Sequence, residues 1–304
     1  MMDLGPNVAR AHERFARSGL VEPLSEDPDD VQHWLDHELA SFIENRAGVL
    51  IEPNALDESA RRDWIGRVTL DALLESPHGA YSRPFWICDG DQRLGTVALG
   101  TLLHGSSMLN LSSLYLHPRA RRRGLSRGVL TAAYHALTAE GLHGLRLDTL
   151  WSWQPAVRHY LSLGMWVYGW KRDPVLCWKR TLPTWSLEVA GDDARFMVDG
   201  APLISARKHG ERLEWQERGA ASEAARFAPG TFALALAVRG WPLITGDPTR
   251  ATERARGGSE MGGPEGLAFQ IPRWEAWDRA QGWRVETPAI PGLVYASWEE
   301  LAGD

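Results

Sequence analysis

The chain has 304 residues, of which 44% are hydrophobic and 24% are charged, a composition typical of globular proteins and a length that favours two domains. Its formal net charge of −6 at pH 7 argues against a dedicated nucleic-acid binder. Because no stretch is long and apolar enough to span a bilayer, the N-terminus lacks a signal-peptide core, and Cys88 and Cys177 form no metal-spaced cluster, we expect a cytoplasmic protein without membrane, nucleic-acid or metal partners.

The N-terminal part is predicted to be helical apart from one short strand. Residues 1–19 are polar with a weak helical pattern and form an N-terminal lead-in, and Leu20–Leu24 is the candidate for the first strand. The acidic run Ser25–Asp30 suits the first turn of a helix. This helix has an apolar face whose members recur at spacings of three and four: Val31, Trp34, Leu35, Leu39 and Phe42. A second helix is predicted from about Asp57.

From residue 85 onward, strands and helices are predicted to alternate. Phe85–Cys88 and Leu94–Leu102 are strand-like runs on either side of Asp89-Gly90-Asp91, which is a hairpin turn signal. The next strand ends at His117, and a helix with a buried face follows. The remaining predicted elements of this region are a strand at Leu145–Leu150, a helix between Pro155 and Gly164, and a strand at Val175–Lys179.

Beyond Thr184 the sequence changes character, and we predict a separate α/β module that is rich in strands. Short strands with tight turns are expected at residues 196–200, 203–206 and 212–216. Longer apolar runs follow at 232–238 and 242–245, and the stretch from Asp247 to Gly266 is expected to be a loop. The predicted domains are therefore residues 1–19, 20–183 and 184–304.

A compact loop rich in arginine and glycine, from Arg119 to Ser126, joins the strand ending at His117 to the next helix. Backbone amides in such a loop point inwards, the helix dipole adds partial positive charge, and arginines bind phosphate in a bidentate way. The spacing Arg121-x-x-Gly124-x-Ser126 resembles motif A of the GNAT superfamily of N-acetyltransferases, whose signature is Q/R-x-x-G-x-G/A and whose ligand is the pyrophosphate of acetyl-CoA.

A second motif follows further along the chain. The segment Gln154–Met165 resembles motif B of the same family, N-x-x-A-x-x-x-Y-x-x-x-G-F, with Ala156, Tyr160 and Gly164 at the matching places. The resemblance covers roughly residues 20–182. It implies an α/β fold of the GNAT type, in which a mixed sheet is flanked by helices, followed here by the smaller C-terminal module.

The resemblance also implies a site for acetyl-CoA as cosubstrate and no metal. The pantetheine arm would pair with backbone along Leu114, Tyr115 and Leu116. The residues that would bind the pyrophosphate, largely through their amides, are Arg121, Arg122, Arg123, Gly124, Leu125, Ser126 and Arg127. Gly124 is required there because a β-carbon would crowd the phosphate. Ser126 departs from the Gly or Ala of the motif.

Tyr160 matches the family tyrosine that protonates the leaving thiolate, and the alternative is that it is a packing residue of its helix. The family often has a carboxylate on the strand before motif A, where this chain has Ser112 and Ser113, which could hold a water that relays a proton. His104, His117 and His159 are other candidate bases, and an amine that arrives neutral would need none. Trp153 stands where motif B has asparagine.

These observations predict an acetyl-CoA-dependent N-acetyltransferase that acts by direct attack of a primary amine in a ternary complex. The alternative is a catalytically degenerate GNAT fold that binds acyl-CoA as a sensor or scaffold. A third interpretation, a hydrolytic C-terminal module, depends on the run Ala237–Asp247, which resembles the last acidic motif of PIN-type nucleases. The acceptor remains open between a small-molecule amine and a protein amine, and the sequence does not indicate an oligomeric state.

Overall fold

The computed structural model describes residues 5–47, 53, 56, 75–76, 80–101, 107–149, 153–170, 174–210, 212–217, 222–242, 284–287 and 290–294. The chain divides into two compact units, residues 1–146 with 280–304, and residues 147–279. The helix predicted from Asp57, His104, and the predicted loop from Asp247 to Gly266 lie outside the described residues.

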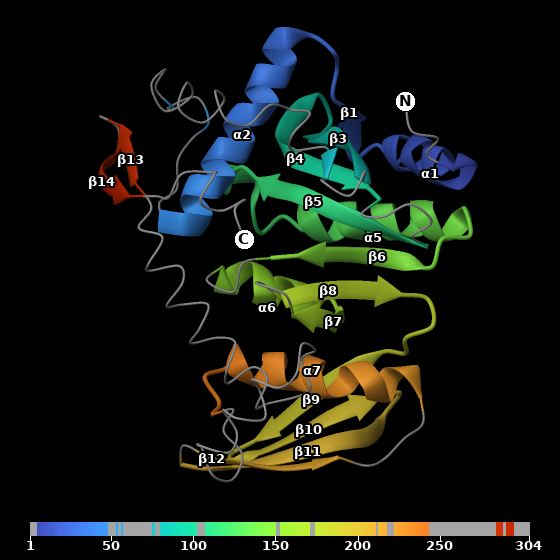
Figure 1. The fold of residues 1–304 in the computed structure, drawn as a ribbon, viewed down its shortest axis with the longest axis vertical. Coiled ribbons are helices and arrows are strands. Elements are labelled where there is room, and N and C mark those ends of the chain that lie inside the picture. Colours follow the sequence, from blue (N-terminus) through green and yellow to red (C-terminus); the bar gives the residue numbers. More distant parts are fainter. Residues whose placement is uncertain are drawn as a thin grey trace. The chain divides into compact units, whose positions relative to one another are not determined.

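The first unit contains most of a mixed β-sheet, shown in Figure 1. Its strands, in spatial order, are β1 (Val21–Pro23), β3 (Ala80–Asp89), β4 (Gln92–Gly100), β5 (Met108–Leu116) and β6 (Gly144–Asp148). All neighbours are antiparallel except β5 and β6, which are parallel. The short strand β2 (Glu75–Ser76) pairs with β3. The predicted hairpin is confirmed, because β3 and β4 are joined at Gly90, whose φ is +60°.

Three helices of the first unit pack on each other or on this sheet: α1 (Pro6–Ala16), α2 (Pro28–Ala47) and α5 (Leu125–Ala139). The predicted lead-in contributes α1, which lies beside α5 in Figure 1 and packs against it. Phe15 of α1 is fully buried, with its ring centroid 5.1 Å from that of Phe85. Arg10 and Arg14 form ion pairs with Glu140, directly after α5. The N-terminal segment is therefore part of the core of this unit.

Helix α2 packs against β4 and β5 and is fixed by two tryptophans. Trp34 donates a hydrogen bond from its indole N–H to the carbonyl of Phe85 (3.2 Å), and the indole N–H of Trp86 donates to Asp30 (3.1 Å). Both indoles are fully buried in a cluster that includes Leu35 and Cys88. Because each large ring contributes roughly 1.5–3 kcal/mol by burial, this contact sets the position of α2 on the sheet.

The second unit begins in β6 and contains the rest of the sheet and the C-terminal module. The strand order continues from β6 to β8 (Pro174–Lys179) and β7 (Trp166–Trp170), with α6 (Gln154–Ser162) between β6 and β7 in the chain. A separate antiparallel sheet follows, in the order β12-β11-β10-β9. Its strands are β9 (Trp185–Ala190), β10 (Asp193–Val198), β11 (Ala201–His209) and β12 (Arg212–Glu217). The predicted short strands of this module are confirmed.

Helix α7 (Glu223–Ala237) joins these two parts of the second unit, because it packs against β7 as well as against β10 and β11. The Thr231 hydroxyl accepts a hydrogen bond from the backbone N–H of Val167 (2.9 Å) and donates one to the carbonyl of Phe227 (2.8 Å). The rings of Trp166 and Phe196 meet edge to face with centroids 5.7 Å apart. The module that follows Thr184 is therefore packed directly on the strand that follows motif B.

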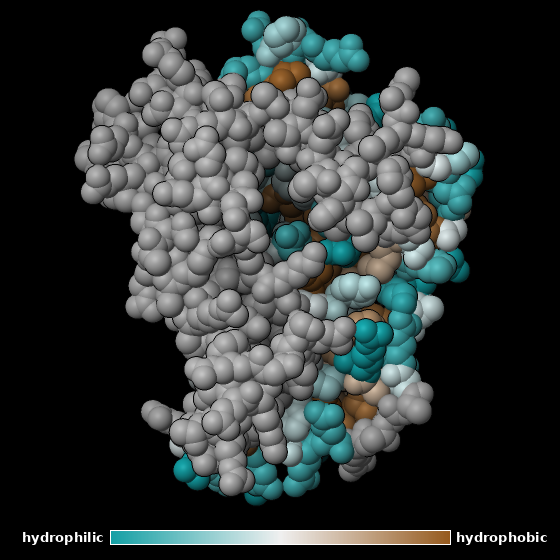
Figure 2. Space-filling model, in the orientation of Figure 1, coloured by the Kyte–Doolittle hydropathy of each residue, from teal (hydrophilic) through white to brown (hydrophobic). Residues whose placement is uncertain are grey.

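The described part of one face of the molecule is mainly hydrophilic. Figure 2 shows teal side chains over most of the described part of this face, with smaller brown areas between them. Among the described residues, the large hydrophobic side chains classed as exposed are Tyr168 and Val189. No helix within the described ranges has both the length and the apolar character needed to cross a membrane. Strands β13 (Arg284–Thr287) and β14 (Ile290–Val294) pair with each other. The predicted fold class, a mixed sheet flanked by helices followed by a β-rich module, is confirmed.

Candidate active site

A β-bulge interrupts β5 at Ser112, Ser113 and Leu114, which the resemblance makes candidates for proton relay and for contact with the pantetheine arm. Thr96 of β4 is opposite Tyr115 and Ala98 is opposite Ser112, so β5 has one residue more than β4 between these pairs. Ser113, within the bulge, has a φ of +54°, in the left-handed region that few non-glycine residues adopt. Bulges of this kind redirect side chains and backbone groups next to active sites. Ser112, Ser113 and Leu114 are all partly exposed here.

The two strands approach each other closely beside the bulge. A β-carbon placed on Gly95 of β4 would lie 2.0 Å from the carbonyl oxygen of Tyr115. This position therefore has to be glycine if the backbones of β4 and β5 are to keep their spacing. The Tyr115 ring itself is buried, with 1% of its surface exposed, whereas Leu114 and Leu116 are partly exposed. On the other side of β5, pairing with β6 covers only Met108–Asn110.

The Arg/Gly loop ends in a helix start that is suited to an anion. Gly124 is the N-cap of α5, with φ +81° and ψ 0°, and no side chain of the described residues caps the first turn. The helix begins with the hydrogen bond from the Gly128 N–H to the Gly124 carbonyl (2.9 Å), so the amides before Gly128 have no partner within the helix. The first turn contains no acidic residue. The partial positive charge of the helix start is therefore not neutralised locally.

The four arginines around the loop have different environments. The Arg121 guanidinium forms a two-pronged ion pair with Glu44 of α2, and its Nε donates to the Leu116 carbonyl (2.8 Å). Arg123 pairs with Asp89 at the surface, an interaction that costs little to break. Arg122, with φ +62°, and Arg127 are exposed and form no hydrogen bond or ion pair with the part of the chain that the structure describes. The resemblance implies the same role, pyrophosphate binding, for all four arginines, whereas the structure pairs Arg121 with Glu44 of α2.

The loop fits a pyrophosphate group. A β-carbon placed on Gly124 would meet no heavy atom within 4 Å, so the space in front of the loop is open as far as the described residues define it. The uncapped amides, the helix dipole, which no acidic residue of the first turn opposes, and the exposed Arg122 and Arg127 would hold a doubly charged phosphate there. Leu125 and Ser126 form the first residues of α5 and would contribute their amides.

Glu38 of α2 is a carboxylate at the bulge that the sequence analysis missed. Its Oε1 lies 2.9 Å from the Thr96 hydroxyl, which is also 3.0 Å from the Ser113 carbonyl oxygen. Burial raises the pKa of Glu38 to about 7, although hydrogen bonds from Ser113 and Thr96 act in the opposite direction. The sequence contained a signal, since Glu38 lies within the apolar face of α2, four residues after Trp34.

Tyr160 belongs to the second unit, on α6, and is 5% exposed. Burial, and to a lesser extent the negative charge of Asp148, raises the pKa of its hydroxyl above the ordinary value. Within the described ranges, this hydroxyl has no hydrogen-bond partner. The helix has the predicted ends, with Pro155 in its first turn and Gly164, at φ +79°, just after it. Trp153 precedes the helix and accepts the Ala156 N–H through its carbonyl (2.9 Å).

The described histidines near these residues have different surroundings. His37, beside Glu38 on α2, is buried, and burial lowers its pKa to about 4. His159 lies at the end of α6, with its ring centroid 5.6 Å from that of Tyr160. Among the described residues, no group of three or more His, Cys, Asp or Glu side chains is arranged to hold a metal ion.

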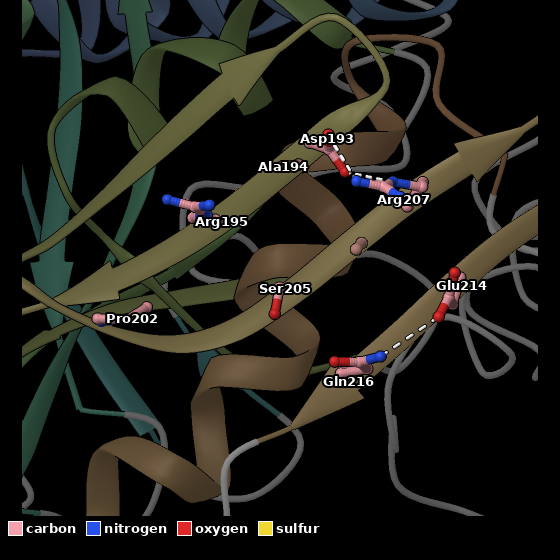
Figure 3. A pocket seen from close by; sticks show the side chains of 9 residues that line it. Asp193, Ala194, Arg195, Pro202, Ser205, Arg207, Glu214 and Gln216 are labelled. Carbon is pink, nitrogen blue, oxygen red and sulfur yellow. Dashed lines mark hydrogen bonds and ion pairs between the residues drawn. The ribbon is translucent and has the colours of Figure 1, made fainter.

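A hollow of about 480 Å³ lies on one face of the C-terminal sheet, and Figure 3 shows its lining. Asp193 pairs with Arg207, and Gln216 donates to Glu214 (3.3 Å), so much of its charge is compensated within the sheet. None of the predicted site residues lines it. The nuclease-like run starts at Ala237, the last residue of α7 rather than part of a strand, and its aspartate lies outside the described residues.

Known proteins resemble this chain in sequence motif and in fold. Residues 51–165 match the model of the acetyltransferase (GNAT) family. No curated protein matches the chain. Among solved structures, the chain is similar to the paia N-acetyltransferase from Thermoplasma acidophilum in complex with coenzyme A, at 16% identity and a TM-score of 0.40, over 52% of this chain and 98% of that one.

Two further structures have comparable likeness. An acetyltransferase of the GNAT family from Staphylococcus aureus Mu50 is 13% identical with a TM-score of 0.36, over 52% of this chain and 98% of that one. A tandem GNAT protein from the clavulanic acid biosynthesis pathway is 14% identical with a TM-score of 0.36, over 78% of this chain and 94% of that one. The family match covers the bulged strand β5, the loop and α5, and ends just after α6. Residues 51–165 therefore match the acetyltransferase (GNAT) family, over a stretch that includes β5, the loop and α5.

Proposed function

We propose that the protein is an N-acetyltransferase that uses acetyl-CoA and transfers the acetyl group to a primary amine by direct attack in a ternary complex. The observation that carries the proposal is the uncapped start of α5 at Gly124, directly after a strand that is bulged at Ser113. When bound, acetyl-CoA supplies a thioester whose acetyl group can be transferred. The acceptor is either a small-molecule amine or an amine of a protein.

Different residues of the first unit bind different parts of acetyl-CoA. The loop from Arg122 to Arg127 holds the pyrophosphate through amides and the exposed arginines, and Leu114 to Leu116 offer backbone groups to the pantetheine arm. Arg121 acts indirectly: its ion pair with Glu44 and its bond to the Leu116 carbonyl tie the loop to α2 and to the end of β5. Because a two-pronged guanidinium–carboxylate pair is directional, it holds the loop in one conformation.

Tyr160 is proposed as the proton donor for the leaving thiolate. The raised pKa of its hydroxyl keeps the proton in place at neutral pH. We expect Tyr160→Phe to lower kcat by about 10²-fold while acetyl-CoA affinity stays close to the wild-type value, as measured by steady-state kinetics and calorimetry. Thermal unfolding is the control, since phenylalanine keeps the buried ring. A variant with full turnover would show that Tyr160 serves only in packing.

The function as a whole is tested by offering the purified protein acetyl-CoA with a panel of primary amines and following the release of free thiol. Binding and turnover together support the enzyme. The alternative, an acyl-CoA sensor or scaffold, is favoured by the serines at 112 and 113, where the family often has a carboxylate. That alternative predicts binding without turnover of any amine. The two cysteines are buried and free, which supports the expectation of a reducing, cytoplasmic location.

A further inference from the structure

The Glu38 side chain differs from those of Asp30, Glu44 and Glu140 in having no cationic partner among the described residues. Glu44 pairs with Arg121, Asp30 pairs with Arg93, and Glu140 pairs with Arg10 and Arg14. Glu38 is held instead by the hydroxyls of Thr96 and Ser113. A carboxylate that is largely withdrawn from water is stabilised when a cation completes its surroundings.

The position of Glu38 places this carboxylate next to the reacting region. Thr96 connects it to the Ser113 carbonyl, and Ser113 is the left-handed residue of the bulge in β5. Glu38 as a residue is partly exposed, and a ligand that lies along the bulge is proposed to reach its carboxylate. Trp34, one turn earlier on α2, is anchored to the Phe85 carbonyl and fixes the height of Glu38 over the sheet.

We propose that Glu38 is the general base of this site and that the acceptor is a primary amine that arrives as a cationic ammonium group. This inference depends on the proposed acetyltransferase function and specifies its substrate class. The ammonium supplies the cation that Glu38 lacks, and Glu38 removes the proton that prevents the nitrogen from attacking. The base therefore comes from α2 rather than from the strand before the loop, where Ser112 and Ser113 stand.

The chemical step balances without any further reactant. Glu38 accepts one proton from the ammonium group, which frees the nitrogen lone pair. The nitrogen then forms a bond with the acetyl carbon as the C–S bond of the thioester breaks, and the sulfur takes up a proton from a donor, for which Tyr160 is the candidate. The products are an N-substituted acetamide and free CoA. The second proton of the former ammonium is lost to solvent, and the proton held by Glu38 returns through solvent to the donor, which restores both groups.

Among the described residues, the elements packed around Glu38 carry the following titratable groups. On α2 these include His33, Asp36, His37 and Glu44; β5 and the residues after it contribute Tyr115, His117 and Arg121; and β4 contributes Arg93. Arg121 and Arg93 are engaged with Glu44 and Asp30, and the low pKa of His37 keeps it neutral at pH 7. The pKa of Glu38, about 7, is set by burial and by two hydroxyls. The carboxylate is therefore near half-ionised at neutral pH, as an efficient base requires.

The test compares the wild type with Glu38→Gln, which keeps the shape of the side chain and removes its charge. Thiol release is followed with paired amines such as benzylamine, which is cationic at pH 7, and aniline, which is neutral at that pH. With cationic amines, kcat/KM at pH 7 should fall by roughly 10²–10⁴-fold, and the loss should shrink as the pH approaches the amine's own pKa. Activity on neutral amines should be nearly unchanged.

Thermal stability provides a second readout that does not depend on activity. The pKa of Glu38 in the folded state lies above its unfolded value, so the folded state binds more protons between the two and wild-type stability falls as the pH rises through about 7. Glu38→Gln lacks this loss, so its Tm should exceed that of the wild type at pH 8 by more than at pH 5. A purely structural role would instead lower the Tm at both pH values.

Asp30→Asn is the matched control, since Asp30 is a partly buried carboxylate on the same helix that already has a cationic partner. It should lose stability at pH 8 and keep the pH profile of turnover. If Glu38→Gln turns over cationic amines like the wild type, the assignment is wrong. It is also wrong if kcat/KM falls equally for cationic and neutral amines and the Tm does not rise above that of the wild type at pH 8. If the wild type fails to bind acetyl-CoA or to acetylate any amine, the proposed function is wrong instead.

Discussion

Replacing Gly124 with alanine is expected to weaken acetyl-CoA binding by roughly tenfold to hundredfold, a loss of about 1–3 kcal/mol. The β-carbon would project into the open space in front of the loop, where the pyrophosphate is proposed to lie. It would also strain a backbone held at φ +81°, which costs about 1–2 kcal/mol for a residue other than glycine. Calorimetric titration with acetyl-CoA measures the first effect, and chemical unfolding measures the second.

The same helix offers a matched control for the strain. Gly141, just after α5, has φ +78°, and a β-carbon placed there also meets no heavy atom within 4 Å. Gly141→Ala should therefore lose a similar amount of stability and bind acetyl-CoA with wild-type affinity. Equal affinities for the two variants would show that the start of α5 does not bind the cosubstrate.

Ending the chain after Pro183 is expected to yield a protein that does not fold cooperatively. The truncation removes α7 and β9–β12, and so uncovers Trp166 and Val167, which are each 2% exposed in the full chain. Exposing these side chains and leaving the Val167 N–H without its acceptor costs several kcal/mol, which is comparable to the 5–15 kcal/mol that stabilises a typical domain. Loss of a cooperative transition in calorimetry, together with low solubility, is the expected result.

A pair of point variants isolates the hydrogen bond at this contact. Thr231→Val removes the acceptor of the Val167 N–H and should cost about 1–3 kcal/mol in the full chain, whereas Thr231→Ser keeps the hydroxyl and should cost less. A truncated protein that unfolds cooperatively at the wild-type temperature would show that β7 is stable without α7.

Much of the first unit could be predicted because its local signals agree with its packing. The Asp89-Gly90-Asp91 turn, the apolar face of α2 and the glycine at the start of α5 each specify the structure that forms. The structure of the C-terminal module was harder to predict from the sequence. The apolar run at residues 232–238 lies largely within α7, which is buried on several sides and so has no helical period to recognise. Pro229 inside this helix also argues against a helix at that point.

The site was predicted less completely than the fold because a side chain's partner depends on tertiary contacts. Arg121 and Arg123 are two residues apart in a basic run, yet Arg121 pairs with Glu44, which is 77 residues away in sequence, and Arg123 pairs with Asp89. Glu38 could have been noticed as a charge on an apolar face, but its proximity to Ser113 follows from the bulge in β5. A motif specifies which backbone conformation is needed, and it does not specify which helix lies over it.

The close approach of β4 and β5 at Gly95 has a consequence for how this protein can evolve. Any side chain at that position would collide with the Tyr115 backbone, so the geometry of the bulge cannot be tuned through it. Glu38 and the partly exposed residues of the bulge, by contrast, project from the backbone and can be exchanged without moving a strand. Under the proposed function, descendants of this chain would therefore acquire new acceptors by changing side chains on α2 and β5, while the backbone proposed to present the acyl group stays fixed.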